Sequence, residues 1–123
     1  MNTSTPADTL PSKVTLQSIK DLLQSAGGRT IGKFAGLTVR SHFQPIYSVA
    51  HSRTVRFEGL VRAADVNGYP VAPLDAFKTG KRFEHVLTLD RLADAVHLRN
   101  FLDLKADGWL FLNMNTDVLL ASV

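Results

Sequence analysis

Charged residues interrupt a hydrophobic run between residues 54 and 63, and all of them stand at even-numbered positions. Side chains alternate between the two faces of a β-strand. One face would carry Glu58, Leu60 and Arg62, and the other would carry Phe57, Gly59 and Val61. The apolar residues favour a strand, while one face holds both a carboxylate and a guanidinium. Such a face suits a site for a metal ion and a phosphate, and it also suits an edge strand with a charged, solvent-facing side.

The hydrophobic pattern predicts a helix ahead of this strand. Ser12 can cap a helix that extends to about Ser25, with apolar residues at helical spacing at Leu16, Ile19, Leu22 and Leu23. Gly27-Gly28 would end the helix, and residues 32–36 would form a connector. A strand over residues 37–49 then pairs antiparallel with the strand at 54–63 through a hairpin.

The second half of the chain predicts helices followed by a buried strand. Pro73 opens one helix. Thr88 caps another, which ends before Asp107 and buries Leu89, Leu92, Ala93 and Val96. Residues 109–114 are largely apolar at consecutive positions, which indicates a buried parallel strand. Residues 117–123 resemble the beginning of one more helix.

Composition narrows the class of protein. The chain is 45% hydrophobic and 20% charged, as in ordinary globular proteins. It has no cysteine, which excludes disulfides and thiol catalysis and fits a cytoplasmic protein. No apolar run approaches the ~20 residues of a membrane span, so we expect no membrane partner. The net charge of +3 comes without a basic cluster, and DNA binding is not expected.

Several short motifs follow one another after residue 42. They are Phe43-Gln44-Pro45-Ile46, a turn at 50–53, Glu58-Gly59-Leu60-x-Arg62, a proline-led helix at Pro73, Leu89-Asp90 and Leu112-Asn113-Met114-Asn115. Their order and spacing resemble the beginning of the EAL domain, the bacterial cyclic-di-GMP phosphodiesterase family of signal transduction. Gly59 stands where the family has alanine, and Asn115 stands where it usually has serine.

The resemblance implies a ligand and its binding residues. Glu58 and Asn113 match positions that bind a metal ion in the family, and their hard oxygen atoms suit Mg²⁺ or Mn²⁺. Gln44, Leu60 and Arg62 match positions that contact cyclic-di-GMP, with Arg62 on a phosphate. In the family, metal-bound carboxylates position a water molecule for attack on one phosphodiester bond.

Each of these residues also has a simpler structural explanation. Arg62 could pair with Asp65, and Asn113 could cap the loop after its strand. Gln44 could form a hydrogen bond at the end of its strand, and Leu60 could fill the protein interior.

The fold implied by the resemblance is α/β, the N-terminal fragment of an EAL-type variant (β/α)₈ TIM barrel with an antiparallel first strand pair. Such a barrel needs about 250 residues, whereas this chain has 123. We therefore expect residues 1–36 to form a polar lead, an amphipathic helix and a connector. Residues 37–123 would form a truncated EAL domain with about three strands and their helices.

This truncation leaves two functions open. The family's later acidic motifs and its catalytic lysine would lie beyond Val123, so no complete catalytic set is expected here. The chain would be the N-terminal part of a hydrolase that converts cyclic-di-GMP to the linear dinucleotide, inactive by itself. Alternatively, it would be a non-catalytic module that senses cyclic-di-GMP or regulates a protein partner. The open edge of the strand at 109–114 also predicts a homo-oligomer.

Overall fold

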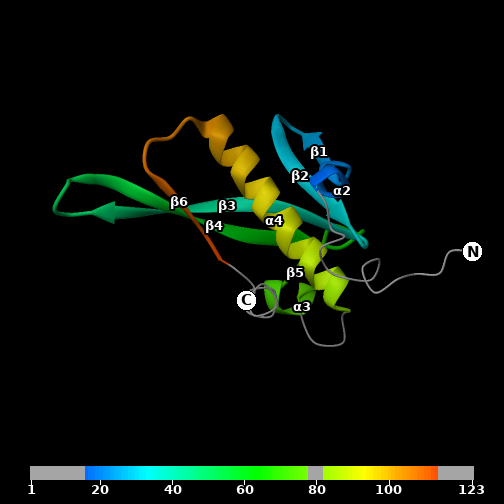
Figure 1. The fold of residues 1–123 in the computed structure, drawn as a ribbon. Coiled ribbons are helices and arrows are strands. Elements are labelled where there is room, and N and C mark those ends of the chain that lie inside the picture. The colour runs from blue at the N-terminus through cyan, green and yellow to red at the C-terminus, as the bar shows by residue number, and fades with distance from the viewer. Residues whose placement is uncertain (1–15, 78–81, 114–123) are drawn as a thin grey trace, which may run out of the picture.

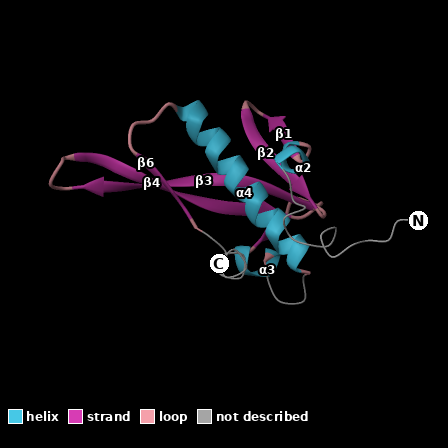
Figure 2. Cartoon of the chain, viewed as in Figure 1, coloured by secondary structure: helices cyan, strands magenta, loops and turns pink. Residues whose placement is uncertain are grey.

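One open sheet and one long helix make up most of the fold (Figures 1 and 2). The structure, a computed structural model, describes residues 16–77 and 82–113. The sheet has six strands in the order β1-β2-β3-β4-β5, and β6 lies beside β4. Helix α4 crosses the sheet diagonally and contacts β2, β3 and β4. No helix within the described ranges is both long enough and apolar enough to cross a membrane.

The element bounds are as follows. The strands are β1 (Leu23–Ala26), β2 (Arg29–Phe34), β3 (Leu37–Ser48), β4 (Arg53–Ala64), β5 (Pro70–Val71) and β6 (Trp109–Leu112). The helices are α2 (Leu16–Lys20), α3 (Pro73–Ala76) and α4 (Phe83–Leu104).

Strands β3 and β4 form the long antiparallel hairpin that the sequence predicts. Their register extends from Thr38 opposite Ala64 to Ser48 opposite Arg53. It shifts between Ile46 and Tyr47, where β4 carries one extra residue as a β-bulge. The hairpin extends beyond the rest of the sheet, at the left of Figure 1.

The predicted helix from Ser12 to Ser25 is confirmed over residues 16–20 and is wrong from residue 21 to 25. Helix α2 ends at Lys20, and the chain continues as the β1–β2 hairpin. Gly27 and Gly28 form its two-residue turn, with φ angles of 60° and 80°. A type I′ hairpin turn requires a positive φ at both central residues, which glycine adopts without strain. The predicted connector is also wrong from residue 32 to 34, because β2 continues to Phe34.

The predicted barrel fragment is wrong as well. Strand β2 pairs antiparallel with β3, so β1 to β5 form a continuous antiparallel meander. Among the described strands, only β6 is parallel to its neighbour, β4. A (β/α)₈ barrel repeats parallel strands with a helix after each one. In this chain, the β1–β2 hairpin occupies the edge of β3, and the result is an open, mostly antiparallel sheet.

Helix α4 buries the face that the sequence predicts but begins earlier. Its 22 residues contain no glycine or proline, and Leu89, Leu92, Ala93 and Val96 are all buried. The predicted cap at Thr88 lies inside the helix, which begins at Phe83. Val86 and Leu87 form a small cluster with Phe77 and Phe83, and this packing accounts for the additional first turn.

The main core lies between α4 and the sheet. It joins Ile19, Val39, Ala76, Leu89, Leu92, Ala93 and Val96. Helix and sheet approach closely at Gly32, where an added Cβ would lie 2.7 Å from Leu92 Cγ and 2.8 Å from both of its methyl carbons. Leu92 is fully buried, so its side chain has no free space to move into.

The predicted parallel strand is confirmed as β6, which pairs parallel with β4. Its predicted burial is wrong. Trp109 lies opposite Arg56, and Leu112 lies opposite Gly59. Trp109 is 74% exposed and Phe111 is 48% exposed, so only one face of the strand is covered. The helix predicted at residues 117–123 lies outside the described residues, as does Asn115.

We expect Gly32→Ala to destabilise the fold by about 1–3 kcal/mol, because overpacking against Leu92 outweighs the ~0.5–1 kcal/mol that alanine gains in chain entropy. Urea denaturation measures the free energy of unfolding. Lys33→Ala, at the exposed neighbouring residue, is the control. Adding Leu92→Ala makes room for the new methyl group, so the double variant should lose less than the sum of the two single changes. An unchanged stability in Gly32→Ala would contradict the close approach.

The predicted homo-oligomer remains a prediction, and β6 is where we expect it to form. Within the described ranges, β4 is the only strand that pairs with β6. An open strand edge with exposed apolar residues is a template for pairing with another chain. We expect light scattering at low micromolar concentration to show a dimer or larger species, and Trp109→Lys to shift it towards the monomer. A parent protein that stays monomeric over this range would contradict the prediction.

Candidate functional site

The sheet has one face that α4 does not cover, which we call the open face. Odd-numbered residues of β3 and β4 point to α4: Phe43 and Phe57 contact the Phe101 ring, and an added Cβ at Gly59 would lie 3.0 Å from His97. Even-numbered residues therefore form the open face. They are Thr38, Arg40, His42, Gln44 and Ile46 of β3, and Arg56, Glu58, Leu60 and Arg62 of β4. None of the nine is buried.

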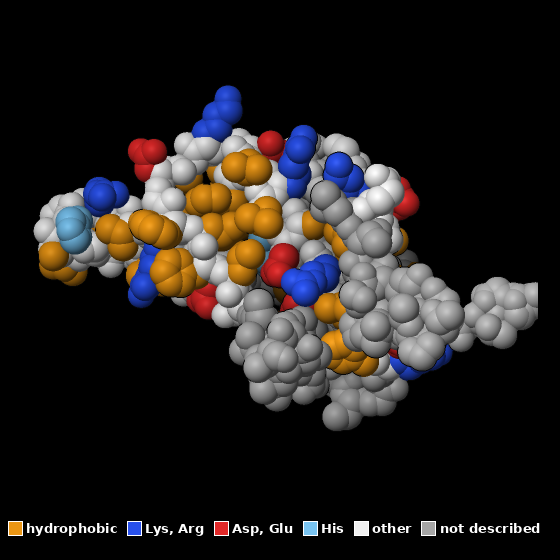
Figure 3. Space-filling view, viewed as in Figure 1, with side chains coloured by type: hydrophobic (Ala, Val, Ile, Leu, Met, Phe, Trp, Pro, Cys, Tyr) orange, Lys and Arg blue, Asp and Glu red, His pale blue; other side chains and the backbone are white. Residues whose placement is uncertain are grey.

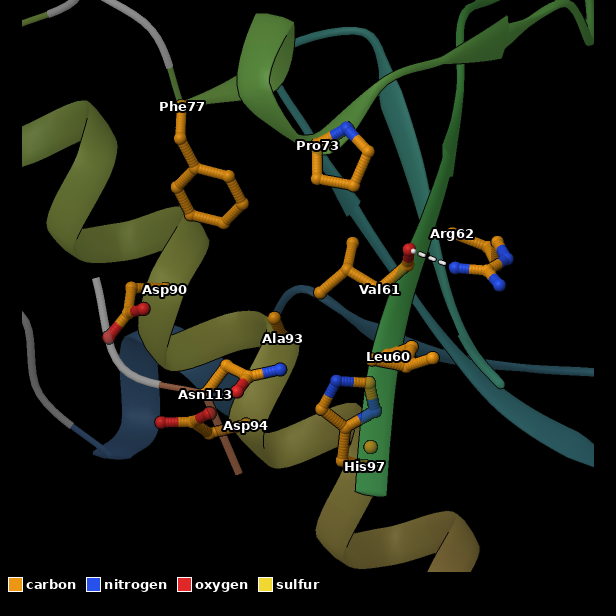
Figure 4. A pocket seen from close by; sticks show the side chains of 11 residues that line it. Leu60, Val61, Arg62, Pro73, Phe77, Asp90, Ala93, Asp94, His97 and Asn113 are labelled. Carbon is orange, nitrogen blue, oxygen red and sulfur yellow. Dashed lines mark hydrogen bonds between the residues drawn. The ribbon is translucent and has the colours of Figure 1, made fainter. Parts of the chain in front are cut away.

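The four sequence-predicted residues of β3 and β4 lie together on this face. Gln44 is directly opposite Glu58 in the hairpin register, and Leu60 and Arg62 follow along the same strand. The Arg62 guanidinium is exposed and donates a hydrogen bond from Nη1 to the Val61 carbonyl oxygen, 3.2 Å away. Figure 4 shows this side chain projecting from β4 on the side opposite Val61.

Asp65, the alternative partner proposed for Arg62, takes part in the turn after β4. Its Oδ1 accepts hydrogen bonds from the backbone N–H groups of Asn67 and Tyr69, at 2.9 and 3.0 Å. This carboxylate therefore has a structural role in the turn, while the Arg62 guanidinium bonds to its own strand.

The fifth predicted residue, Asn113, directly follows β6. Leu112 pairs with Gly59, so Asn113 comes level with Leu60 one residue later. The metal ion implied by the resemblance would use Glu58 and Asn113. Residues 16–77 and 82–113 contain no group of three or more His, Asp or Glu side chains that could hold a metal ion. Two oxygen ligands are too few for Mg²⁺, so the described residues alone do not fit the ion, which remains a prediction.

The open face is richer in cations and aromatic rings than the sequence indicated. Arg40, Arg56 and Arg62 share it with one carboxylate, Glu58. The Arg56 guanidinium carbon lies 4.9 Å from the centre of the Phe111 ring, in cation–π geometry. The alternation that singled out Glu58 extends back to Arg56, but only the pairing of β6 with β4 brings Phe111 beside it.

A cavity of about 300 Å³ lies between β4 and α4 (Figure 4), and three of the sequence-predicted residues, Leu60, Arg62 and Asn113, are among its lining residues. Strand β6 pairs with β4 over residues 56–59, and β5 pairs with it over residues 63–64. No described strand pairs with residues 60–62 on that edge, and the cavity lies at this gap. Helix α4 contributes Asp90, Asp94 and His97 to its lining.

Burial changes the protonation of two groups at this cavity. It raises the pKa of Asp94 from 3.8 to about 6, with a further contribution from the charge of Asp90 and an opposing one from Arg91. It lowers the pKa of His97 from 6.5 to about 4. His97 Nδ1 shares a hydrogen bond of 2.7 Å with Ser41 Oγ, and its ring packs near Phe43. His97 is therefore a neutral, packed residue at pH 7.

Comparison with known proteins adds no family assignment. No protein-family model matches the chain, and no curated protein or solved structure is significantly similar to it. The resemblance to the EAL domain therefore remains a prediction from the motifs themselves.

We expect Asp94→Asn to stabilise the protein more at high pH than at low pH. A folded-state pKa above the unfolded value means that the folded state holds its proton more tightly, so this contribution to stability is lost as pH rises from about 4 to above 6. Asparagine does not ionise, so the variant does not lose this stability as the pH rises. The advantage of the variant should reach the order of 1–2 kcal/mol after allowance for partial exposure.

Urea denaturation of parent and variant at pH 4.5 and 7.5 (roughly the two ends of this titration) gives the comparison. His97 changes stability in the opposite direction over part of this range, but it is common to both proteins and cancels in the difference. Asp103→Asn, at an exposed carboxylate of the same helix, is the control. An advantage of Asp94→Asn that stays constant with pH would contradict the raised pKa.

Proposed function

We propose that this protein takes part in cyclic-di-GMP signalling as a module that binds the dinucleotide on the open face without hydrolysing it. One observation supports the proposal above the others. Gln44, Leu60 and Arg62, which the motif resemblance associates with cyclic-di-GMP, share the face of the sheet that α4 does not cover. Glu58, which the resemblance associates with a metal ion, lies on the same face directly opposite Gln44. The alternation of β4 alone would not have placed Gln44 there.

The charge of the open face suits an anionic ligand. Its three arginines outnumber its single carboxylate, and all three are exposed. A guanidinium binds two phosphate oxygens at once through a planar pair of N–H donors. Arg62 uses one nitrogen for the Val61 carbonyl, and its remaining N–H groups are available for a phosphate.

Binding is a better-supported function than hydrolysis for the described residues. Metal-assisted hydrolysis requires several carboxylates around an activated water molecule. The residues of β3 and β4 on the open face provide one carboxylate, Glu58. The second possibility, the N-terminal part of an active phosphodiesterase, rests on the motif resemblance. A cytoplasmic location, expected from the cysteine-free sequence, belongs to the proposal.

Isothermal titration calorimetry with cyclic-di-GMP tests the proposal. We expect saturable binding that weakens with added salt and weakens about 10-fold or more in Arg62→Ala, because a charge-assisted hydrogen bond is worth about 1.5–3 kcal/mol. Arg99→Ala is the matched control, since Arg99 is an exposed arginine of α4 that lies near Asp103. Absence of binding to the parent protein would overturn the proposal.

The same samples, incubated with Mg²⁺ or Mn²⁺, are assayed for the linear dinucleotide. We expect none to form. Turnover that disappears in Glu58→Ala would instead support the phosphodiesterase.

A further inference from the structure

A groove lies on the open face beside the residues of the proposed site. Two adjoining hollows share Ile46, Arg56 and Phe111. The smaller, about 190 Å³, extends to Glu58. The larger, about 590 Å³, extends to Tyr47 and Trp109. We call the two together the Arg56–Phe111 groove. Figure 3, which views the molecule from the side of α4, shows hydrophobic and basic side chains side by side at the hairpin end.

The shape of the groove follows from the β-bulge in the hairpin. The register shift occurs between Ile46 and Tyr47 and leaves Val55 without a partner. All three residues line the larger hollow. A bulge bends its strand and redirects the neighbouring side chains, so the sheet is irregular at the position where β6 adds its two aromatic rings.

The groove presents flat groups to solvent. Trp109 is 74% exposed and Phe111 is 48% exposed, and the Arg56 guanidinium lies over the Phe111 ring. Aromatic rings and guanidinium planes stack on nucleobases, and each base stack is worth about 1–3 kcal/mol. A planar, electron-rich ring system is therefore the ligand class that these walls favour.

At one end of the groove lies the Glu58 carboxylate, whose hydrogen-bonding chemistry differs for the different bases. A carboxylate only accepts hydrogen bonds at neutral pH. The Watson–Crick edge of guanine carries two adjacent donors, N1–H and N2–H₂, which a carboxylate can accept together. The same edge of adenine offers one donor beside an acceptor, and that acceptor would face the carboxylate unfavourably.

We propose that the Arg56–Phe111 groove is a guanine-binding subsite, with the base stacked at Phe111 and its Watson–Crick edge bonded to Glu58. This inference rests on the proposed function and extends it to residues that the motifs do not include. It assigns Glu58 to the base instead of to a metal ion. Glu58 and Arg62 are four residues apart, about 13 Å along a strand, a span suited to a dinucleotide with one base at Glu58 and a phosphate at Arg62.

Trp109 provides a direct signal, because it is the only tryptophan in the chain and it lines the groove. Its fluorescence is followed while guanosine 5′-monophosphate, adenosine 5′-monophosphate or ribose 5-phosphate is added to the full chain. We expect saturable quenching by the guanine nucleotide, quenching at about 10-fold or more higher concentration by the adenine nucleotide, and no change with ribose 5-phosphate.

Two variants and a control test whether the nucleotide that quenches Trp109 binds in the groove. Phe111→Leu should weaken binding of the guanine nucleotide about 10-fold, as expected for the loss of one base stack. Glu58→Gln should reduce the preference for guanine over adenine to about threefold or less, because the amide replaces one acceptor with a donor. Tyr69→Leu, at an exposed aromatic residue outside the groove, should change neither value. Far-ultraviolet circular dichroism verifies that each variant keeps its fold.

The outcomes separate this inference from the proposed function. Cyclic-di-GMP binding that depends on Arg62, with no response of Trp109 to the guanine nucleotide, would overturn the groove and leave the function standing. Guanine-selective quenching that depends on Phe111, without cyclic-di-GMP binding, would support the groove and overturn the function. Equal quenching by both nucleotides, or an undiminished preference for guanine in Glu58→Gln, would overturn the assignment of Glu58 to the base.

Discussion

The close contact of α4 with the sheet determines which surfaces of this protein are available. Two glycines permit it: Gly32 lies against Leu92, and Gly59 lies against the His97 ring. A side chain at either position would push the helix away from the strands. Because α4 covers the odd-numbered side of β3 and β4, the arginines and the carboxylate at even positions remain on the other side. The helix contact thus creates the open face, although none of its own residues lies there.

Strong local periodicity made part of this arrangement predictable. The two-residue alternation of β4 and the hairpin before it suffice to place Glu58, Leu60 and Arg62 on one face. The apolar stripe of α4 predicts its buried side, because Leu89, Leu92, Ala93 and Val96 recur at helical spacing. The parallel pairing of β6 follows from its compact apolar run after a helix. In each case, a long or regular pattern left little room for an alternative.

The β1–β2 hairpin, the exposure of β6 and the groove depend on tertiary contacts that the sequence does not display. Leu22 and Leu23 fit a helical stripe as well as a strand, and short apolar runs do not distinguish the two. The Gly27-Gly28 pair marks both a helix end and a hairpin turn, and only its pairing with β2 selects the turn. Trp109 and Phe111 looked buried because nothing in the sequence shows that only one side of β6 is covered. The Arg56–Phe111 groove likewise requires residues that are far apart in the chain, such as Arg56 and its pairing partner Trp109, to be neighbours.

Among the described strands, none pairs with residues 60–62 on the edge of β4 that faces away from β3. Residues 60–62 lie between a parallel neighbour and an antiparallel one, in a strand that is otherwise paired on this edge from 56 to 64. Backbone groups that no described strand pairs with are a position where a further strand can add. The Arg62 guanidinium bonds to the Val61 carbonyl at this point, so an incoming strand would have to displace a charged group before forming its first hydrogen bond. The residue proposed to bind a phosphate therefore also hinders the addition of a strand at residues 60–62.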